Sequence, residues 1–137
     1  MRALGVDFGG KRIGIAVAEV EARVASPRSA IAASGALKRD AVAISEIFKK
    51  EQATIIVVGE PLGAEGEATK MSKICRKLGE EISLLGHDVR FVDESMTSVA
   101  AAADMRVQDW TAAQRRRHID SEAACRILER FFDAQEG

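Results

Sequence analysis

The chain has 137 residues, of which 47% are hydrophobic and 30% charged, and its formal net charge is −1. That length fits a single domain over residues 1–137 with its own hydrophobic core and leaves no room for a second domain of ordinary size. A charge so close to zero excludes a whole-molecule field that attracts a polyanion, so any nucleic-acid site must be local.

The sequence indicates a protein of a reducing compartment that has no membrane segment. The first five residues lack the apolar core of a signal peptide, and no run approaches the roughly 18 apolar residues of a membrane span. We therefore expect a cytoplasmic protein without a membrane contact. Cys75 and Cys125 lack the paired spacing of a zinc or redox motif and are expected to be buried, reduced core residues.

The first half of the chain predicts strands and one helix. Apolar runs at 3–7 and 13–17 flank a turn that contains glycine, which is typical of a β-hairpin. A third strand is expected near 22–25. Apolar residues at helical spacing then predict a helix over 37–48, and 54–58 is predicted to be a buried strand.

The second half alternates again between helix and strand. A long helix is expected over 71–85, with Gly86 as its stop, and a strand over 89–92. The remainder is predicted to be helical over 96–105, broken around Trp110, and helical again over 119–132. Strands separated by a long helix pair in parallel, whereas the opening hairpin is antiparallel, so we expect an α/β fold with a mixed sheet flanked by helices.

Three carboxylates stand where they can form a shared site. Asp7 and Glu94 follow apolar runs at strand ends, where α/β sheets usually carry their sites. Asp120 falls on the apolar stripe of the last helix and is expected to point toward the sheet. Each also has a simpler interpretation: Asp7 starts the glycine turn, and Glu94 and Asp120 cap helices. Their combined placement favours a shared site.

Ligands that are oxygens alone suit a hard cation, Mg²⁺ or Mn²⁺. Two such ions can activate a water and stabilise the leaving oxygen of a phosphodiester, which is nuclease chemistry. Cations that could contact the nucleic acid cluster at three places, and their value depends on whether they converge in space. The clusters are Lys11-Arg12, then Lys70, Lys73, Arg76 and Lys77, and finally Arg115-Arg116-Arg117.

Four segments resemble the successive motifs of the YqgF/RuvX family. They are Gly5-Val6-Asp7-Phe8-Gly9-Gly10-Lys11-Arg12, Val57-Val58-Gly59-Glu60-Pro61-Leu62, Val92-Asp93-Glu94-Ser95-Met96-Thr97, and Ile119-Asp120-Ser121-Glu122-Ala123-Ala124. The resemblance covers nearly the whole chain, in order. It implies an RNase H-like fold with a five-stranded mixed sheet, and a relation to Holliday junction resolvases and to nucleases of precursor small-subunit ribosomal RNA.

The resemblance also implies roles for individual residues. Asp7, Glu94 and Asp120 match the acidic catalytic, metal-binding set. Lys11 and Arg12 match a basic pair suited to phosphate. Thr97 matches a hydroxyl position of the family and either supports the site or caps the following helix.

Two further expectations come from the sequence itself and not from the resemblance. Arg117, with its neighbours and Trp110, is close to Asp120 in sequence and is expected to guide a nucleic-acid strand. His118 is expected to be an incidental helix-entry residue rather than a general base, since a bound metal can supply the hydroxide.

Two positions depart from the family pattern. Glu60 replaces an apolar residue and either adds a carboxylate to the site or faces solvent. Ser95 replaces an arginine, which removes one expected charge contact.

The favoured hypothesis is a metal-dependent nuclease that hydrolyses structured RNA in the processing of pre-16S ribosomal RNA. The alternatives are a resolvase acting on branched DNA, a non-catalytic nucleic-acid-binding adaptor, and a nucleotide-binding module like those of sugar kinases. The last needs a second lobe that 137 residues do not supply.

Overall fold

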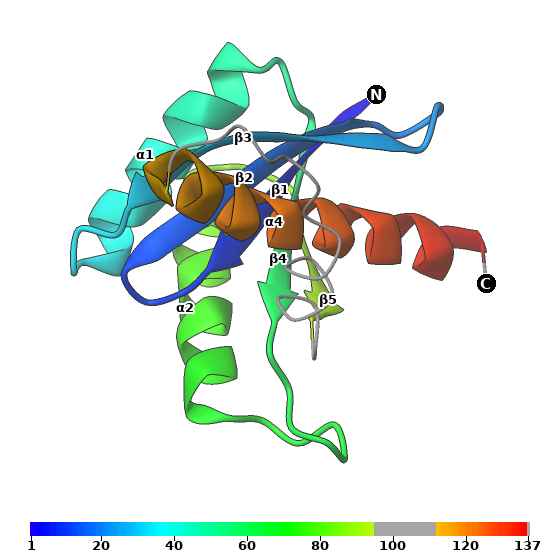
Figure 1. Ribbon diagram of the computed structural model, residues 1–137. Helices are drawn as coiled ribbons and strands as arrows, with labels where there is room; N and C mark the ends of the chain where they lie inside the picture. The colour runs from blue at the N-terminus through cyan, green and yellow to red at the C-terminus, as the bar shows by residue number, and fades with distance from the viewer. Residues whose placement is uncertain (95–111, 137) are drawn as a thin grey trace.

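The computed structural model describes residues 1–94 and 112–136, and within the last helix it describes the side chains from 121 to 134. Over these ranges a five-stranded sheet lies between helices (Figure 1). The elements are β1 (Arg2–Phe8), β2 (Arg12–Glu19), β3 (Val24–Ala32), α1 (Leu37–Lys50), β4 (Ile55–Glu60), α2 (Lys70–Leu84), β5 (Val89–Asp93) and α4 (Ala112–Glu136). The helix expected over 96–105 and the break near Trp110 lie outside the described residues.

The sheet is mixed, as predicted. Its strand order is β3-β2-β1-β4-β5, with β1, β2 and β3 antiparallel and β1, β4 and β5 parallel. Because β1, β4 and β5 run in the same direction, their last residues, Phe8, Glu60 and Asp93, lie at one end of the sheet. We call this end the carboxyl end of the sheet.

The two faces of the sheet carry different side chains. On one face large aliphatic residues such as Leu4, Val6 and Ile15 pack against α1 and α2. On the other face small residues such as Ala3 and Ala16 pack against α4. This division follows from the alternation of side chains along a strand, and it was predictable from the first two strands. It places Asp7 on the same face as Ala3, beneath α4.

Helix α4 crosses the sheet from one edge to the other. The Ser121 hydroxyl donates a hydrogen bond to the Arg28 carbonyl in β3, and the Arg130 guanidinium donates one to the Asp93 carbonyl at the end of β5. Between them α4 presses on β1 so closely that a Cβ on Gly5 would lie 2.8 Å from the Ala124 carbonyl oxygen. Glycine at position 5 therefore sets the distance between helix and sheet.

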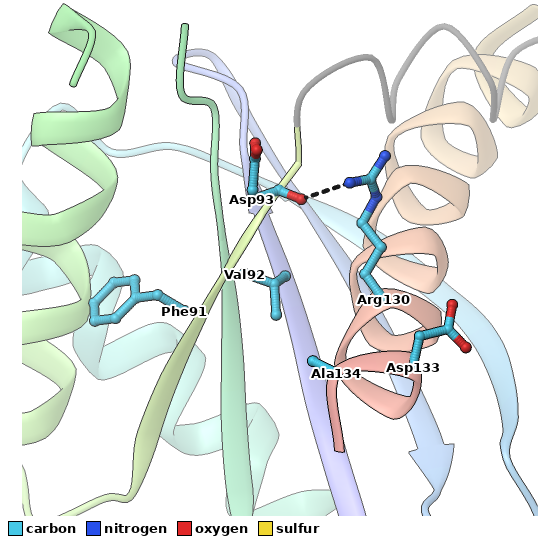
Figure 2. A pocket seen from close by; sticks show the side chains of 6 residues that line it. All are labelled: Phe91, Val92, Asp93, Arg130, Asp133 and Ala134. Atoms are coloured by element: carbon cyan, nitrogen blue, oxygen red, sulfur yellow. Dashed lines mark hydrogen bonds between the residues drawn. The ribbon is translucent and has the colours of Figure 1, made fainter. Parts of the chain in front are cut away.

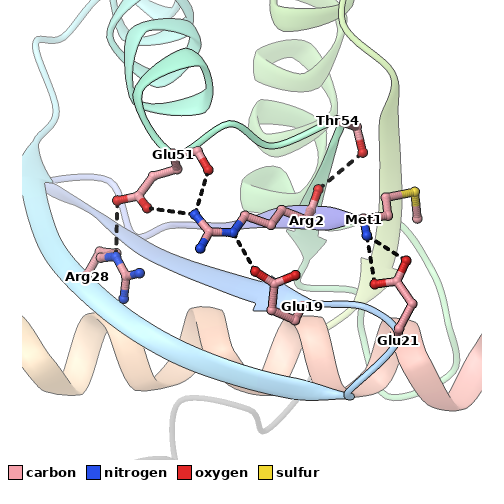
Figure 3. A network of polar contacts seen from close by, with 7 residues as sticks. All are labelled: Met1, Arg2, Glu19, Glu21, Arg28, Glu51 and Thr54. Carbon is pink, nitrogen blue, oxygen red and sulfur yellow. Dashed lines mark hydrogen bonds and ion pairs between the residues drawn. The ribbon is translucent and has the colours of Figure 1, made fainter.

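A polar network fastens the opposite end of the sheet (Figure 3). The Arg2 guanidinium donates to Glu19 at 2.5 Å and to the Glu51 carbonyl at 2.9 Å, and Arg28 donates to the Glu51 carboxylate at 3.1 Å. Glu51 directly follows α1, so the network ties that helix to β1, β2 and β3. It lies away from the carboxyl end and holds the scaffold rather than the site.

Two elements are longer than predicted. β3 spans nine residues rather than the few near 22–25, because it is an edge strand whose Pro27 and polar residues hide the alternation. α4 begins at Ala112 rather than near Ile119, since its first turns are rich in Ala, Gln and Arg, which favour helix without forming an apolar stripe. In the described part of the chain no helix is both long and apolar enough to cross a bilayer.

Candidate active site

Asp7 lies one residue before the end of β1, opposite Gly14 of β2. Its side chain is on the α4 face and is only 9% exposed. Its neighbours on that face, among them Ala3 and Ala16, are small and pack against α4.

Glu94 directly follows β5 and is also buried, at 7% exposure. Its backbone N–H donates to the Glu60 carbonyl at 3.1 Å, so the parallel pairing of β4 and β5 continues by one residue and fixes the Glu94 backbone. A Cβ on Gly59 would lie 2.8 Å from the Glu94 Cδ and 2.4 Å from the Ile127 Cδ1. The Glu94 carboxyl group therefore lies over β4, in space that only glycine leaves open.

The Asp7 and Glu94 carboxyl groups are hydrogen-bonded to each other. Burial, this hydrogen bond and the negative charge of Asp7 raise the pKa of Glu94 to about 10, while the Arg130 guanidinium opposes the rise. Two buried carboxyl groups in such contact repel each other when both are charged, unless a cation compensates them. The raised pKa favours the protonated form of Glu94 at neutral pH when no cation is bound.

This donor set fits a divalent cation of the hard class. It consists of carboxylate oxygens that converge at the carboxyl end of the sheet and carry a surplus of negative charge. Within residues 1–94 and 121–134, no three His, Cys, Asp or Glu side chains gather as a complete metal site. The predicted third ligand, Asp120, lies in α4 just before Ser121, and its side chain lies outside the described residues.

The basic pair lies at the same end of the sheet as Asp7, with Lys11 in the β1–β2 turn and Arg12 at the first residue of β2. The Gly9 N–H donates to the Arg12 carbonyl at 2.9 Å, and Gly10 has a φ of +90° that favours glycine. Both basic residues are exposed. Of the other predicted contacts, Thr97 lies outside the described residues, and so does the side chain of Arg117.

Glu60 does not face solvent. It is 8% exposed, lies on the α2 face of the sheet, and accepts two hydrogen bonds from the Arg76 guanidinium, at 2.8 and 3.2 Å. Arg76 in turn covers the ring of Phe91, 4.3 Å from its centroid. Glu60 and Glu94 thus lie on opposite faces of the sheet. The Glu94 carboxyl group lies over Gly59, and side chains alternate along β4, so Glu60, the next residue, points to the other face.

Two cysteines confirm the prediction of buried, free thiols. Burial raises the pKa of Cys75 to about 12, and the charges of Glu94, Asp7 and Glu60 add to the effect. Burial likewise raises the pKa of Cys125 to about 12. Both thiols therefore stay protonated and unreactive at neutral pH.

One arginine near the site has no counterpart in the sequence-based prediction. Arg130 lines a groove of about 660 Å³ between β5 and the last turns of α4, with its guanidinium against the Asp93 carbonyl (Figure 2). The other lining residues are Phe91, Val92, Asp93, Asp133 and Ala134. Nothing in the sequence signals Arg130, because its proximity to Glu94 depends on how α4 crosses β5.

The mixed sheet with strand order β3-β2-β1-β4-β5 is that of an RNase H-like fold. Two solved structures share the fold over the whole chain. RuvC of Thermus thermophilus in complex with Holliday junction substrate matches with a TM-score of 0.58 at 13% identity, covering 100% of this chain and 96% of that one. The Fowlpox virus resolvase complexed with Holliday junction DNA matches with a TM-score of 0.55 at 9% identity, covering all of both chains.

The chain belongs to the RuvX family, described as Holliday junction resolvase, whose model matches residues 1–134. Curated relatives from Anaeromyxobacter dehalogenans (strain 2CP-C) and Roseiflexus sp. (strain RS-1) are 34% and 36% identical. These matches cover 97% and 98% of this chain, and 97% and 95% of the relatives. Both relatives carry the name "Putative pre-16S rRNA nuclease". The family and its relatives class the protein as a nuclease, a hydrolase that acts on ester bonds.

Proposed function

We propose that this protein is a metal-dependent endonuclease that cleaves structured RNA in the maturation of pre-16S ribosomal RNA, a reaction that belongs to the cytoplasm. The observation that carries the proposal is the buried Asp7–Glu94 pair at the carboxyl end of the sheet. A buried pair of like charges is costly for stability, and Gly59 is needed to accommodate it. Such an arrangement is explained when the pair holds a cation.

Asp7, Glu94 and Asp120 would hold Mg²⁺ or Mn²⁺. When bound, the cation supplies a water of lowered pKa and stabilises the charge that develops on the leaving oxygen. Asp7 and Glu94 come from two different strands, with Gly59 of β4 between them, so the rigid sheet determines their separation. A site built on strands in this way keeps its geometry during the reaction.

The other residues of the site would position the substrate. Lys11 and Arg12 project from a turn whose backbone is hydrogen-bonded, which suits them to hold a phosphate beside the cation. The chain has no tyrosine and only 4% aromatic residues, so stacking on single-stranded bases contributes little. Recognition of backbone and shape is the mode that remains, and it favours a structured substrate.

A second candidate substrate is branched DNA. It is favoured by the description of the family and by the fold shared with resolvases, whose solved complexes contain Holliday junctions. The carboxylate pair serves either nucleic acid equally, since its chemistry is directed at the phosphodiester.

The test compares the wild type with Asp7→Asn and Asp120→Asn on a precursor rRNA fragment and on a four-way DNA junction, with Mn²⁺ and with a chelator. Asp88→Asn is the matched control, since Asp88 is an exposed aspartate paired with Arg90 before β5. We expect Mn²⁺-dependent cleavage by the wild type and the control only. Cleavage that survives chelation, or that is equal in all four proteins, would refute the metal-nuclease proposal. Binding without cleavage would favour the adaptor, and stabilisation by nucleotides the nucleotide-binding module.

A further inference from the structure

The first half of α2 carries a row of exposed lysines. Lys70, Lys73 and Lys77 are three and four residues apart and therefore lie along one side of the helix. That side is opposite the face that packs on the sheet, which is made of Ser72, Cys75, Leu78, Gly79 and Ile82. The row covers about 10 Å of helix at about 1.5 Å per residue.

The charges of α2 are placed against its dipole. The partial positive charge at a helix N-terminus favours acidic residues there and basic residues at the other end. α1 follows this rule in part, with Asp40 beside Lys38 and Arg39 in its first turn, and with Lys49 and Lys50 in its last. α2 has no acidic residue in its first turn and no basic residue in its last. The position of the lysines is therefore not explained by helix stability.

A neutral capping box stabilises the start of α2 in place of acidic residues. The Ser72 N–H donates to the Thr69 hydroxyl oxygen at 3.0 Å, and the Thr69 N–H donates to the Ser72 hydroxyl oxygen at 2.7 Å. Such a box commonly has Glu at the position of Ser72, and a glutamate there would neutralise part of the lysine row. The start of the helix thus keeps its full positive charge.

The lysine row adjoins the basic turn of the candidate active site. A Cβ on Gly10 would lie 3.7 Å from the Met71 Cε, so the β1–β2 turn approaches the first turn of α2. The turn carries Lys11 and Arg12. The site carboxylates lie at the same end of the sheet, since Asp7 is next to the last residue of β1 and Glu94 directly follows β5.

The acidic groups nearby offset only part of this charge. Arg76 is engaged by Glu60, so neither contributes a net charge to the surface. Glu65 and Glu67 lie in the loop 61–69 before α2, where the Glu67 carboxylate accepts a hydrogen bond from the Glu65 N–H. Glu80 and Glu81 lie three and four residues beyond Lys77, close enough to pair with it, whereas Lys70 and Lys73 are at least seven residues from either glutamate. Five cations, from the turn and the lysine row, thus line one path that begins at the carboxyl end of the sheet.

We propose that Lys70, Lys73 and Lys77 bind the phosphate backbone of a double-stranded segment that flanks the cleaved bond. This inference rests on the proposed function, since it assigns the path that the substrate takes away from the site. α2 has no aromatic residue for base stacking, so its contacts are to the backbone. A row of about 10 Å matches about three base pairs at about 3.4 Å each.

The first test measures binding by metal-free protein to an RNA duplex at several salt concentrations. The triple variant Lys70→Gln, Lys73→Gln, Lys77→Gln is compared with a control that has the same change in charge. The control is Lys38→Gln, Lys49→Gln, Lys50→Gln on α1, where the lysines are equally exposed. We expect the α2 triple to weaken binding at least about tenfold at low salt. The slope of log affinity against log salt should fall by roughly 0.9 per lost contact, as for B-form DNA. The control should change neither.

The second test separates binding from folding. The double variant Lys70→Glu, Lys73→Glu places acidic residues where the helix dipole favours them, so its melting temperature should rise by about a degree or more. Its affinity for the duplex should fall nonetheless. A fall in both would mean that the binding loss reflects damage to the fold and would overturn the inference.

The remaining outcomes distinguish this inference from the proposed function. Equal losses in the two lysine triples, or none, would overturn the α2 surface while cleavage by the wild type still stands. The wild type could also bind the duplex through the α2 lysines and yet cleave no substrate with Mn²⁺. That result would refute the proposed nuclease activity and leave the α2 binding surface supported. A wild type that does not bind a duplex at all would overturn the surface.

Discussion

Replacing Glu94 by glutamine should abolish cleavage and yet make the metal-free protein more stable. Glu94→Gln removes a carboxyl group whose pKa rises from 4.5 to about 10 on folding. A group with a raised pKa contributes its full stability below the unfolded value and loses it as the pH rises toward the folded value. The wild type therefore loses stability between pH 4.5 and about 10 relative to the variant.

The size of the effect follows from the pH interval. At pH 7 the interval above the unfolded pKa is 2.5 units, which at about 1.36 kcal/mol per unit gives an upper limit of about 3 kcal/mol. For a chain of this length that corresponds to a rise in melting temperature of roughly 6 to 12 °C. At pH 4.5 the difference should nearly vanish.

Urea unfolding followed by circular dichroism, in a chelating buffer at pH 4.5, 6 and 7, measures this difference. Glu80→Gln is the control, because Glu80 is an exposed glutamate on α2. Mn²⁺ should stabilise the wild type, by about 2.7 kcal/mol at a hundredfold excess over the Kd, and leave Glu94→Gln unchanged. A wild type that is the more stable protein at pH 7 without metal would refute the reasoning.

Three further predictions concern the neighbours of the pair. Gly59→Ala should lower the free energy of unfolding by about 1–3 kcal/mol and abolish cleavage, because its Cβ collides with Ile127 and Glu94. Adding Ile127→Val should restore stability but not activity. Recovery of both would contradict a role of Gly59 in placing Glu94. Arg130→Gln removes the positive charge that lowers the pKa of Glu94, so half-maximal Mn²⁺ binding should need a higher pH, whereas Arg126→Gln should leave the pH profile unchanged. Arg76→Gln should lower the free energy of unfolding by about 1–3 kcal/mol, because it leaves Glu60 buried without a partner. Arg90→Gln should lower it by under about 1 kcal/mol, because its partner Asp88 is exposed. Equal losses would mean that the burial of Glu60 is irrelevant to stability.

The fold was predictable where a local pattern carries the information. The alternation in the first two strands assigned Asp7 to the face of small residues, and Gly86 marked the end of α2, where its φ is +94°. The pattern failed for β3 and for the start of α4, because an edge strand with proline and a polar helical turn leave no apolar period. Local signals thus found the core elements and missed the margins.

The site was predictable only in part, because no single segment of the sequence shows which residues from different strands come into contact. Asp7 and Glu94 were named from their strand ends, and the structure brings them together. The raised pKa of Glu94 depends on its burial, and the partner of Glu60 depends on how α2 packs on β4. No local spacing encodes either contact. Arg130 was missed for the same reason.

The close contact between Gly5 and Ala124 fixes α4 to the sheet at the middle of the helix, so that any tilt of α4 would turn about this contact. Ala124 lies 12 residues from each end of the helix, about 18 Å at about 1.5 Å per residue. A tilt of about 3° would move each tip by about 1 Å, a displacement that can cost an enzyme about a hundredfold in rate. The backbone of Asp120, only four residues from the pivot, would move about 0.3 Å. The backbone of Arg130, six residues from Ala124 on the other side, would move about 0.5 Å under the same tilt. Residues near the middle of α4 therefore keep their positions over the sheet better than residues at its ends.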